Sequence, residues 1–197
     1  MLDESLAAYK KASELNPAMI ESFVGQGNIL NKKGKSDEAI DIFKKAIDVN
    51  SRSAEAYEGL GLVYIHKKQE EDAIKAFSEA IDLNPGLVNS RYNLGILYAK
   101  KSQFNEAVAE WTKAIEINPQ KTEVHYNLGI AYTKLGKLDD AIAVWQKALT
   151  LRPDMADGAL HPVTTGNYVP WIVGRPIKLN RGPGARLRRR VVAASTV

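Results

Sequence analysis

The stretch TEVHYNLGIAYTKLGKLDDAIAVWQKALTLRPDM, residues 122–155, decides the fold, because the residues before it read as imperfect copies of it. The earlier copies begin at Ile20, Ala54 and Val88, so each start lies 34 residues from the next. A fixed period of this size indicates a solenoid of stacked helix pairs. Residues 1–19 supply only the second half of a copy, and we therefore expect the chain to be a fragment of a longer array.

Each copy divides into two amphipathic helices. In the copy that starts at Ala54, apolar side chains recur at helical spacing over 54–67 and again over 71–83, and a short turn separates the two stretches. The sequence predicts that the second helix stops at an Asn-Pro or Arg-Pro pair, because proline cannot continue the hydrogen-bond ladder. Ser51 replaces this proline once, and we expect a less sharply defined end there.

Helix starts and turns inside each pair have their own signals. Asp37, Asn105 and Asp139 are N-cap types and are predicted to cap the second helices. Gly34 and Gly136 suit the turn that precedes those helices.

Columns of small and aromatic residues indicate close helix packing. Glycine recurs in the middle of the first helix, where it costs about 1 kcal/mol relative to alanine, and this recurrence favours close helix approach. An aromatic column, with room left for it by glycine and alanine, is predicted to be core rather than a ligand site. These two columns are Gly27, Gly61, Gly95, Gly129 and Tyr9, Phe43, Phe77, Trp111, Trp145.

The motif YNLGIAY at 126–132, followed by Ala141, Trp145, Ala148 and Pro153, resembles the tetratricopeptide repeat family. The resemblance implies an all-α solenoid of antiparallel helix pairs in a right-handed superhelix, whose first helices line a concave, peptide-binding or protein-binding groove. It divides the chain into a truncated repeat, four full repeats and a tail, at 1–19, 20–53, 54–87, 88–121, 122–155 and 156–197. Gln26, Arg91 and His125 depart from the family pattern, and we expect these positions to pack less well.

The side of each first helix that is turned away from its partner helix predicts the groove. This side keeps aliphatic residues beside polar ones, which is typical of partner sites, although the aliphatic residues could instead pack against the neighbouring first helix. The candidate residues are Glu58, Leu62, His66, Asn89, Tyr92, Asn93, Ile96, Lys100, Glu123, Tyr126, Asn127, Ile130 and Lys134.

Asn93 and Asn127 occupy equivalent positions, and their amides could hold an extended peptide backbone. They resemble two rungs of an asparagine ladder known in this family, with Gly25 and Gly59 in place of the other rungs. The clamp with which some family members grip acidic chaperone C-termini is not reproduced, because its leading lysine would fall at Val24, Glu58 or Tyr92.

Charged residues predict two borders for this groove. Glu21, Glu55 and Glu123 recur near the starts of the first helices, whereas Lys32, His66, Lys100 and Lys134 recur near their ends. Such a surface would suit a ligand with acidic residues along one side and aliphatic anchors beneath. The alternative is that the lysines only complement helix C-termini, at about 0.3 to 1 kcal/mol each.

Several function classes find no support in the sequence. The chain has no cysteine, and its three histidines show neither a nucleophile set nor metal-ligand spacing, so we predict a protein that is no enzyme and has no cofactor and no metal site. The expected partner is a protein or peptide, with no small-molecule substrate and with possible self-association through the array ends. No signal or membrane-spanning segment is visible, and the default expectation is cytoplasmic.

The basic character belongs to the tail. The chain holds 27 Lys and Arg against 23 Asp and Glu, and residues 156–197 hold seven of the cations and one of the anions. An arginine cluster from Arg186 to Arg190 could attract nucleic acid or an anionic membrane. Alternatively, the tail could be foreign or frame-shifted sequence read after a truncated gene. For the repeats themselves, the alternative to a non-enzymatic interaction module is a substrate-recruiting or regulatory segment of a larger enzyme.

Overall fold

The computed structural model describes residues 1–153, and the predictions made for the tail lie outside this part of the chain. The described residues form helices and no strand. The helices are α1 (Leu2–Leu15), α2 (Ile20–Lys32), α3 (Ser36–Val49), α4 (Ala54–His66), α5 (Glu70–Leu83), α6 (Val88–Lys100), α7 (Phe104–Ile117), α8 (Thr122–Lys134) and α9 (Leu138–Leu151).

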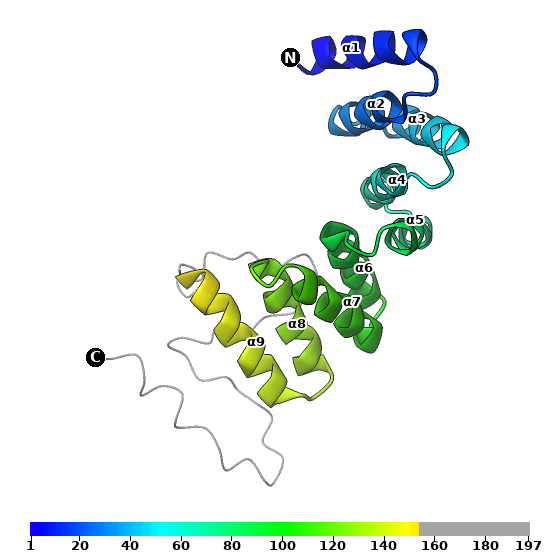
Figure 1. The fold of residues 1–197 in the computed structure, drawn as a ribbon. Coiled ribbons are helices and arrows are strands. Elements are labelled where there is room, and N and C mark those ends of the chain that lie inside the picture. Colours follow the sequence, from blue (N-terminus) through cyan, green and yellow to red (C-terminus); the bar gives the residue numbers. More distant parts are fainter. Residues whose placement is uncertain (154–197) are drawn as a thin grey trace, which may run out of the picture. The chain divides into compact units, whose positions relative to one another are not determined.

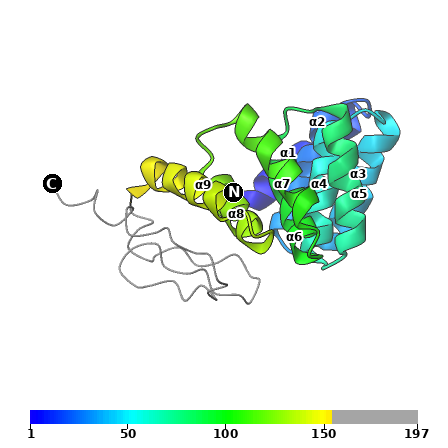
Figure 2. The ribbon, with the colours of Figure 1, turned by 90° about the horizontal axis from the view of Figure 1, so that it is seen from below.

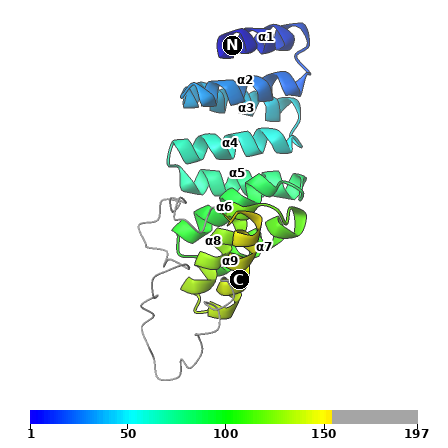
Figure 3. The ribbon, with the colours of Figure 1, turned by 90° about the vertical axis from the view of Figure 1, so that its left-hand side faces the viewer.

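Loops of two lengths alternate along the stack. Three residues join the helices of a pair, as between α2 and α3, and four residues join one pair to the next, as between α3 and α4. Each helix packs against its neighbours in chain order, and the first helices α2 and α4, and α6 and α8, also touch. Figures 1 and 2 show α3 and α5 on one side of the stack and α2 and α4 on the other, and Figure 3 shows α1 to α5 lying one over the next. The described chain is therefore an all-α repeat solenoid.

One residue in each three-residue turn has left-handed backbone. Gly34 and Gly136 have φ of 74°, as the sequence predicted, and Lys68 and Ser102 take the same conformation at 59° and 61°. The predicted N-caps were wrong, because Asp37, Asn105 and Asp139 lie one residue inside their helices and Lys35, Gln103 and Lys137 precede them. An acidic side chain in this first turn still interacts favourably with the helix dipole.

An asparagine closes four of the five second helices. Asn16, Asn50, Asn84 and Asn118 each accept, through the side-chain oxygen, a hydrogen bond from the backbone N–H two residues later, at 2.9 to 3.1 Å. Ser51 does not blur the end of α3 as expected, because Asn50 forms the same turn without a following proline.

Four of the five residues of the aromatic column form the core, whereas Tyr9 in α1 is 39% exposed. Phe43, Phe77, Trp111 and Trp145 are between 0 and 6% exposed. A Cβ added to Gly27 would lie 2.7 Å from the Phe43 ring, so the ring needs the missing side chain. The same ring also lies against Gly59 of the next pair, so Phe43 contributes to the packing within its own pair and to the packing on the next.

The three positions expected to pack poorly are buried instead. Gln26 donates from Nε2 to the Ser13 hydroxyl at 3.0 Å, and Arg91 forms an ion pair with Glu110 at 2.7 Å. His125 is also buried, with Nε2 2.9 Å from the Pro119 carbonyl oxygen. Polar partners on other segments replace the apolar contacts that the family pattern would supply, so this prediction was wrong.

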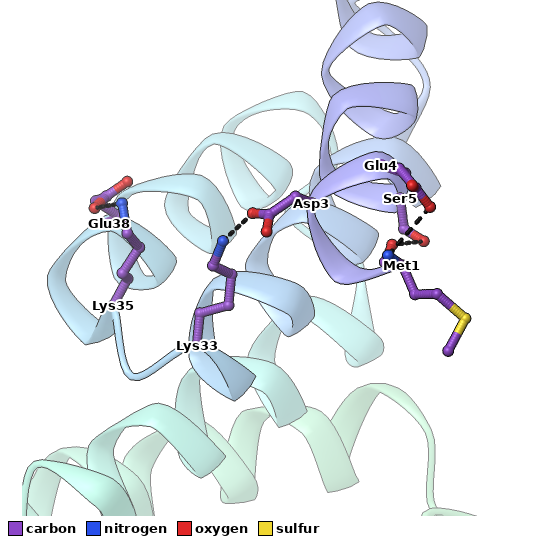
Figure 4. Close-up of polar contacts among 7 residues, drawn as sticks. All are labelled: Met1, Asp3, Glu4, Ser5, Lys33, Lys35 and Glu38. Atoms are coloured by element: carbon purple, nitrogen blue, oxygen red, sulfur yellow. Dashed lines mark hydrogen bonds and ion pairs between the residues drawn. The ribbon is translucent and has the colours of Figure 1, made fainter.

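Ion pairs cross from one pair to the next with a constant sequence offset. Asp3 pairs with Lys33, as Figure 4 shows, and Glu71 pairs with Lys101 at 2.9 Å. Asp37 and Lys67 form the equivalent pair between α3 and α4. Asn105 and Leu135 occupy these positions between α7 and α8, so the described chain has no such pair there. No described helix is long and apolar enough to cross a membrane.

Candidate functional site

The side of the stack formed by α2, α4, α6 and α8, here called the first-helix face, carries the candidate residues. Its best-defined part lies between α6 and α8. Asn127 donates from Nδ2 to the Tyr92 hydroxyl at 3.3 Å, and the Lys121 ammonium lies 5.4 Å from the centre of the Tyr92 ring. Lys121 also donates to the side-chain oxygen of Asn89. The hydroxyl and one ring face of Tyr92 are therefore held by the next pair.

Tryptophans of the second helices fix the backbone beneath this part of the face. Trp111 donates from Nε1 to the Tyr92 carbonyl at 3.1 Å, and Trp145 donates in the same way to Tyr126 at 3.0 Å. Tyr92 and Tyr126 are half-buried, and burial raises the pKa of both hydroxyls. Both phenols therefore stay neutral near pH 7 and can donate a hydrogen bond.

The two asparagines are not equivalent in the structure. Asn127 is 5% exposed and bonded to Tyr92, whereas Asn93 is partly exposed and forms no side-chain hydrogen bond among the described residues. Only Asn93 keeps its whole amide for a ligand. In the first two full pairs Gly25 and Gly59 fill this column, because an aromatic of the preceding helix occupies the space of a side chain.

The aliphatic candidates are partly exposed and partly packed. Leu62 packs against the cluster of Phe77 and Leu94, and Ile96 packs against the cluster of Trp111 and Leu128. Ile130 is also partly exposed. Leu62 and Ile96 therefore fit both interpretations of the sequence. They pack against the neighbouring helices, and part of each side chain remains exposed on the first-helix face.

Several residues of the predicted charged borders already have partners. Lys100 pairs with Glu70 at 3.2 Å, and His66 donates from Nδ1 to the Asn31 side chain at 2.8 Å. Glu58, a groove candidate outside these borders, accepts a hydrogen bond from the Ser90 hydroxyl at 2.9 Å.

The two remaining border residues of the third and fourth pairs differ in their freedom. Glu123 lies 3.8 Å from Arg152. Lys134 is exposed and has no ion pair within the described part of the chain, so it is the basic candidate best placed to meet an acidic ligand.

Lys121 and Ser90 contact candidate residues of this face, Asn89 and Glu58 respectively, although the sequence analysis did not select them. Both lie next to the predicted first-helix stripe, where a 34-residue column shows little pattern, since Lys121 follows Met19, Ser53 and Leu87. Each of them bonds to a residue 32 positions earlier, on the preceding first helix. A 34-residue periodicity does not predict contacts at this offset.

The described residues hold no group of three or more metal-ligating side chains. His66 bonds to an amide and His125 to a backbone carbonyl, so neither is paired with a nucleophile.

Comparison with known proteins places this arrangement in a family. Tetratricopeptide repeat models match residues 24–88, 76–109 and 122–155, and a TPR repeat model matches residues 97–136. A crystal structure of MamA protein is 30% identical over 82% of this chain and 88% of its own, with a TM-score of 0.67. The chain belongs to the tetratricopeptide repeat family.

Other solved TPR proteins agree. A second MamA crystal structure is 29% identical, covers 79% of this chain and 91% of its own, and has a TM-score of 0.69. YrrB, described as a TPR protein with an unusual peptide-binding site, is 27% identical over 78% of this chain and 79% of its own, with a TM-score of 0.64. None of the curated protein sequences matches. The TPR fold makes the chain a protein-interaction module.

Proposed function

We propose that the first-helix face binds an extended peptide or protein segment, mainly across α6 and α8. The observation that carries this proposal is the repeated pair of an aromatic and an aliphatic residue, Tyr92 with Ile96 and Tyr126 with Ile130, partly exposed at the same register on two touching helices. Apolar patches with polar rims often mark partner sites. A peptide-binding site in the similar protein YrrB supports the same role here.

The face offers distinct contacts to such a ligand. Asn93 can donate to and accept from a peptide backbone, the Tyr126 hydroxyl can bond to it, and Lys134 can pair with an acidic side chain. Asn127 contributes by holding Tyr92. This assignment leaves Lys100 and His66 out of the predicted ligand contacts, because their side chains already bond to Glu70 and Asn31.

Peptide-library panning followed by calorimetry tests the proposal. Asn93→Ala and Lys134→Ala should each weaken the selected peptides roughly fivefold, the equivalent of about 1 kcal/mol. Lys100→Ala should change binding less than Lys134→Ala, because Lys100 already pairs with Glu70. Lys45→Ala and Lys113→Ala on the second helices are the matched controls. Binding that falls in these controls, or stays unchanged in both Asn93→Ala and Lys134→Ala, would move the site elsewhere.

Self-association is a second candidate function, and the exposure of α1 favours it. Five of the eight large hydrophobic residues that are exposed in the described chain lie between Met1 and Met19. Tyr9 is 39% exposed, although its counterparts in the aromatic column are core. Sedimentation at increasing protein concentration, with Tyr9→Ser and Leu2→Ser as the comparison, should show an association that the variants reduce. Concentration-independent sedimentation of the unaltered chain would reject it.

A further inference from the structure

The same four residues, Val-Asn-Ser-Arg, occur twice in the chain, at 49–52 and at 88–91. The first copy spans the end of α3 and the loop to α4, and the second copy forms the start of α6. We propose that Asn50, in the first copy, is a site of spontaneous deamidation, at which the backbone nitrogen of Ser51 displaces the side-chain amide. This reactivity does not depend on a ligand of the first-helix face.

The reaction exchanges one amide bond for another within the chain. The Ser51 nitrogen loses its hydrogen to solvent and attacks Cγ of Asn50, so that an N–Cγ bond forms, the Cγ–Nδ2 bond breaks, and Nδ2 leaves as ammonia with a proton from solvent. Water then opens the resulting five-membered imide at one of its two carbonyl carbons, which gives aspartate or isoaspartate. The attack needs a backbone N–H on the residue after the asparagine, and proline is the residue that lacks one.

The turn at Asn50 prepares its side chain for this attack. Arg52 donates from its backbone N–H to the side-chain oxygen of Asn50 at 2.9 Å, and the ring that this hydrogen bond closes contains the Ser51 peptide group. A donor at this distance stabilises the negative charge that develops on the oxygen during the attack. Closing the imide also requires rotation about the Cα–C bond of Asn50. Asn50 and Ser51 are both exposed, so no core packing opposes this rotation and water reaches the site.

Three other helix ends have the same turn without the reactive N–H. Asn16, Asn84 and Asn118 accept the equivalent hydrogen bond at 3.0 to 3.1 Å. Each is followed by proline, whose nitrogen has no hydrogen to lose and cannot form the imide. The backbone does not distinguish the four asparagines, because φ lies between −145° and −131° and ψ between 89° and 104° at all of them. The N–H of Ser51 is therefore what makes Asn50 reactive.

The second copy of the tetrapeptide has the N–H but is held in a helix. Asn89 and Ser90 lie in the first turn of α6, where Arg91 donates from its backbone N–H to the Leu87 carbonyl at 3.1 Å. Ser90 is buried, and the side-chain oxygen of Asn89 accepts a hydrogen bond from Lys121. The helix fixes ψ of Asn89, so the imide can close only when the start of α6 opens.

Deamidation at Asn50 would alter the connection between the first two full helix pairs. Isoaspartate adds one carbon to the backbone between α3 and α4, directly before the residue that caps α4. This residue is Ser53, which donates from its N–H to the Asn50 carbonyl at 3.1 Å and accepts from the Ala56 N–H at 3.3 Å. Phe43 lies against Gly59 at the same junction. We therefore expect a slow loosening of α3 against α4 as the protein ages.

Peptide mapping of the whole folded chain after prolonged incubation tests the proposal. Trypsin releases residues 46–52 and 76–91, and tandem mass spectrometry of these peptides follows Asn50, Asn84 and Asn89 separately. At mildly alkaline pH, Asn50 should convert to aspartate and isoaspartate at least roughly tenfold faster than Asn89, because the reaction at Asn89 requires the helix to open. Asn84 should stay unconverted.

The chain unfolded in urea is the matched control for local sequence. There the two copies should react at similar rates, because their four residues are identical. Equal rates at Asn50 and Asn89 in the folded protein would overturn the proposal. Conversion of Asn50 in the unfolded chain alone would also overturn it, because the turn would then protect the side chain.

Ser51→Pro tests the attacking nitrogen. The variant restores the proline that follows the other three asparagines, and the extended backbone of Asn50 already suits the residue before a proline, so we expect it to fold. Conversion at Asn50 should be lost, while the rate at Asn89 stays unchanged. Conversion of Asn50 that continues in Ser51→Pro would overturn the mechanism.

Hydrogen exchange of the isoaspartate form, separated by chromatography, tests the structural consequence. Protection of α3 and α4 should fall relative to the unconverted chain, whereas protection of α6 and α7 should change little. Unchanged protection of α3 and α4 would overturn the expected loosening.

Discussion

Two residues in the turns inside the helix pairs adopt a left-handed backbone conformation that is less strained for glycine. Lys68 and Ser102 have positive φ, whereas Gly34 and Gly136 fill the same turn in other pairs. Left-handed backbone costs a residue with a side chain about 1 to 2 kcal/mol, part of which glycine loses again through its chain entropy. Lys68→Gly or Ser102→Gly should raise the free energy of unfolding by about 0.5 to 1 kcal/mol in urea titrations. Gly34→Ala should lower it, and a gain in that control would contradict this account.

The buried tryptophans combine packing with a hydrogen bond that can be separated from it. Trp145→Ala should lower the free energy of unfolding by about 3 to 5 kcal/mol, because it leaves a cavity between α8 and α9. Trp145→Phe keeps most of the ring but removes the bond to the Tyr126 carbonyl, and should cost less. Chemical denaturation of both variants checks the order. Equal losses would mean that the hydrogen bond, rather than the volume, dominates.

At this scale the sequence predicted apolar contacts better than polar ones. The aromatic column was predicted to be core; Phe43, Phe77, Trp111 and Trp145 confirm this, whereas Tyr9 is 39% exposed and the prediction was wrong there. The partners of Gln26, Arg91 and His125 escaped prediction, because they lie on other segments and at offsets unrelated to the helical period. A repeat pattern shows which columns are apolar, and it does not show which polar atoms meet across helices.

At the scale of helices, an ion pair recurs at three junctions and is absent from the fourth among the described residues. Asn105→Asp with Leu135→Lys would install it between α7 and α8, at the positions of Glu71 and Lys101. Exposed pairs contribute little, so a double-mutant cycle should give a coupling of about 0.2 to 1 kcal/mol at low salt, and less at about 1 M salt where charges are screened. Coupling that is zero or unaffected by salt would show that α7 and α8 meet in another register.

Helix α1 has the sequence pattern of a second helix, but its side chains are not buried as those of the other second helices are. None of its residues is fully buried, whereas α3 buries Ala39, Ile40, Phe43 and Ala46. Amides of α1 should therefore exchange with solvent at least roughly tenfold faster than those of α3, since local stability follows buried apolar contact. Mass-spectrometric hydrogen exchange at neutral pH measures this difference. Equal protection would mean that α1 gains cover through association, which dilution would remove.

For the whole molecule, three half-buried tyrosines contribute stability that is lost at high pH. Burial raises the pKa of Tyr92, Tyr98 and Tyr126, and nearby glutamates add to the rise at Tyr92 and Tyr98. The unfolded chain loses these protons at the ordinary pKa of about 10, whereas the folded chain retains them to higher pH. The stability is therefore complete below about pH 10 and falls as pH rises above it. Absorbance at the tyrosinate band, followed with circular dichroism, should show a late fraction that titrates with unfolding and is smaller in Tyr92→Phe.

For the candidate site, the sequence indicated which positions correspond from one repeat to the next, but it did not indicate which side chains contact one another. The 34-residue period placed Tyr92, Asn93, Tyr126 and Asn127 on corresponding faces, and the structure brings Tyr92 and Asn127 into direct contact. Their different roles depend on which neighbour each side chain meets, and the two asparagines look identical in the sequence. The same limit explains why Lys121 was missed.

The shared aromatic column has a consequence for how such a gene can change by duplication. Phe43 packs on Gly27 in its own unit and on Gly59 in the following one. A copy of this unit inserted elsewhere therefore needs a following first helix that leaves room for the ring. In an inserted unit, the aromatic ring must therefore fit the residue 16 positions downstream. That residue is glycine after Tyr9 and Phe43, and asparagine after Phe77 and Trp111. Recombination within the aromatic helix would break that pairing, whereas recombination that moves the ring together with the following first helix would preserve it. The packing unit defined by the Phe43 ring is thus offset by one helix from the helical hairpin.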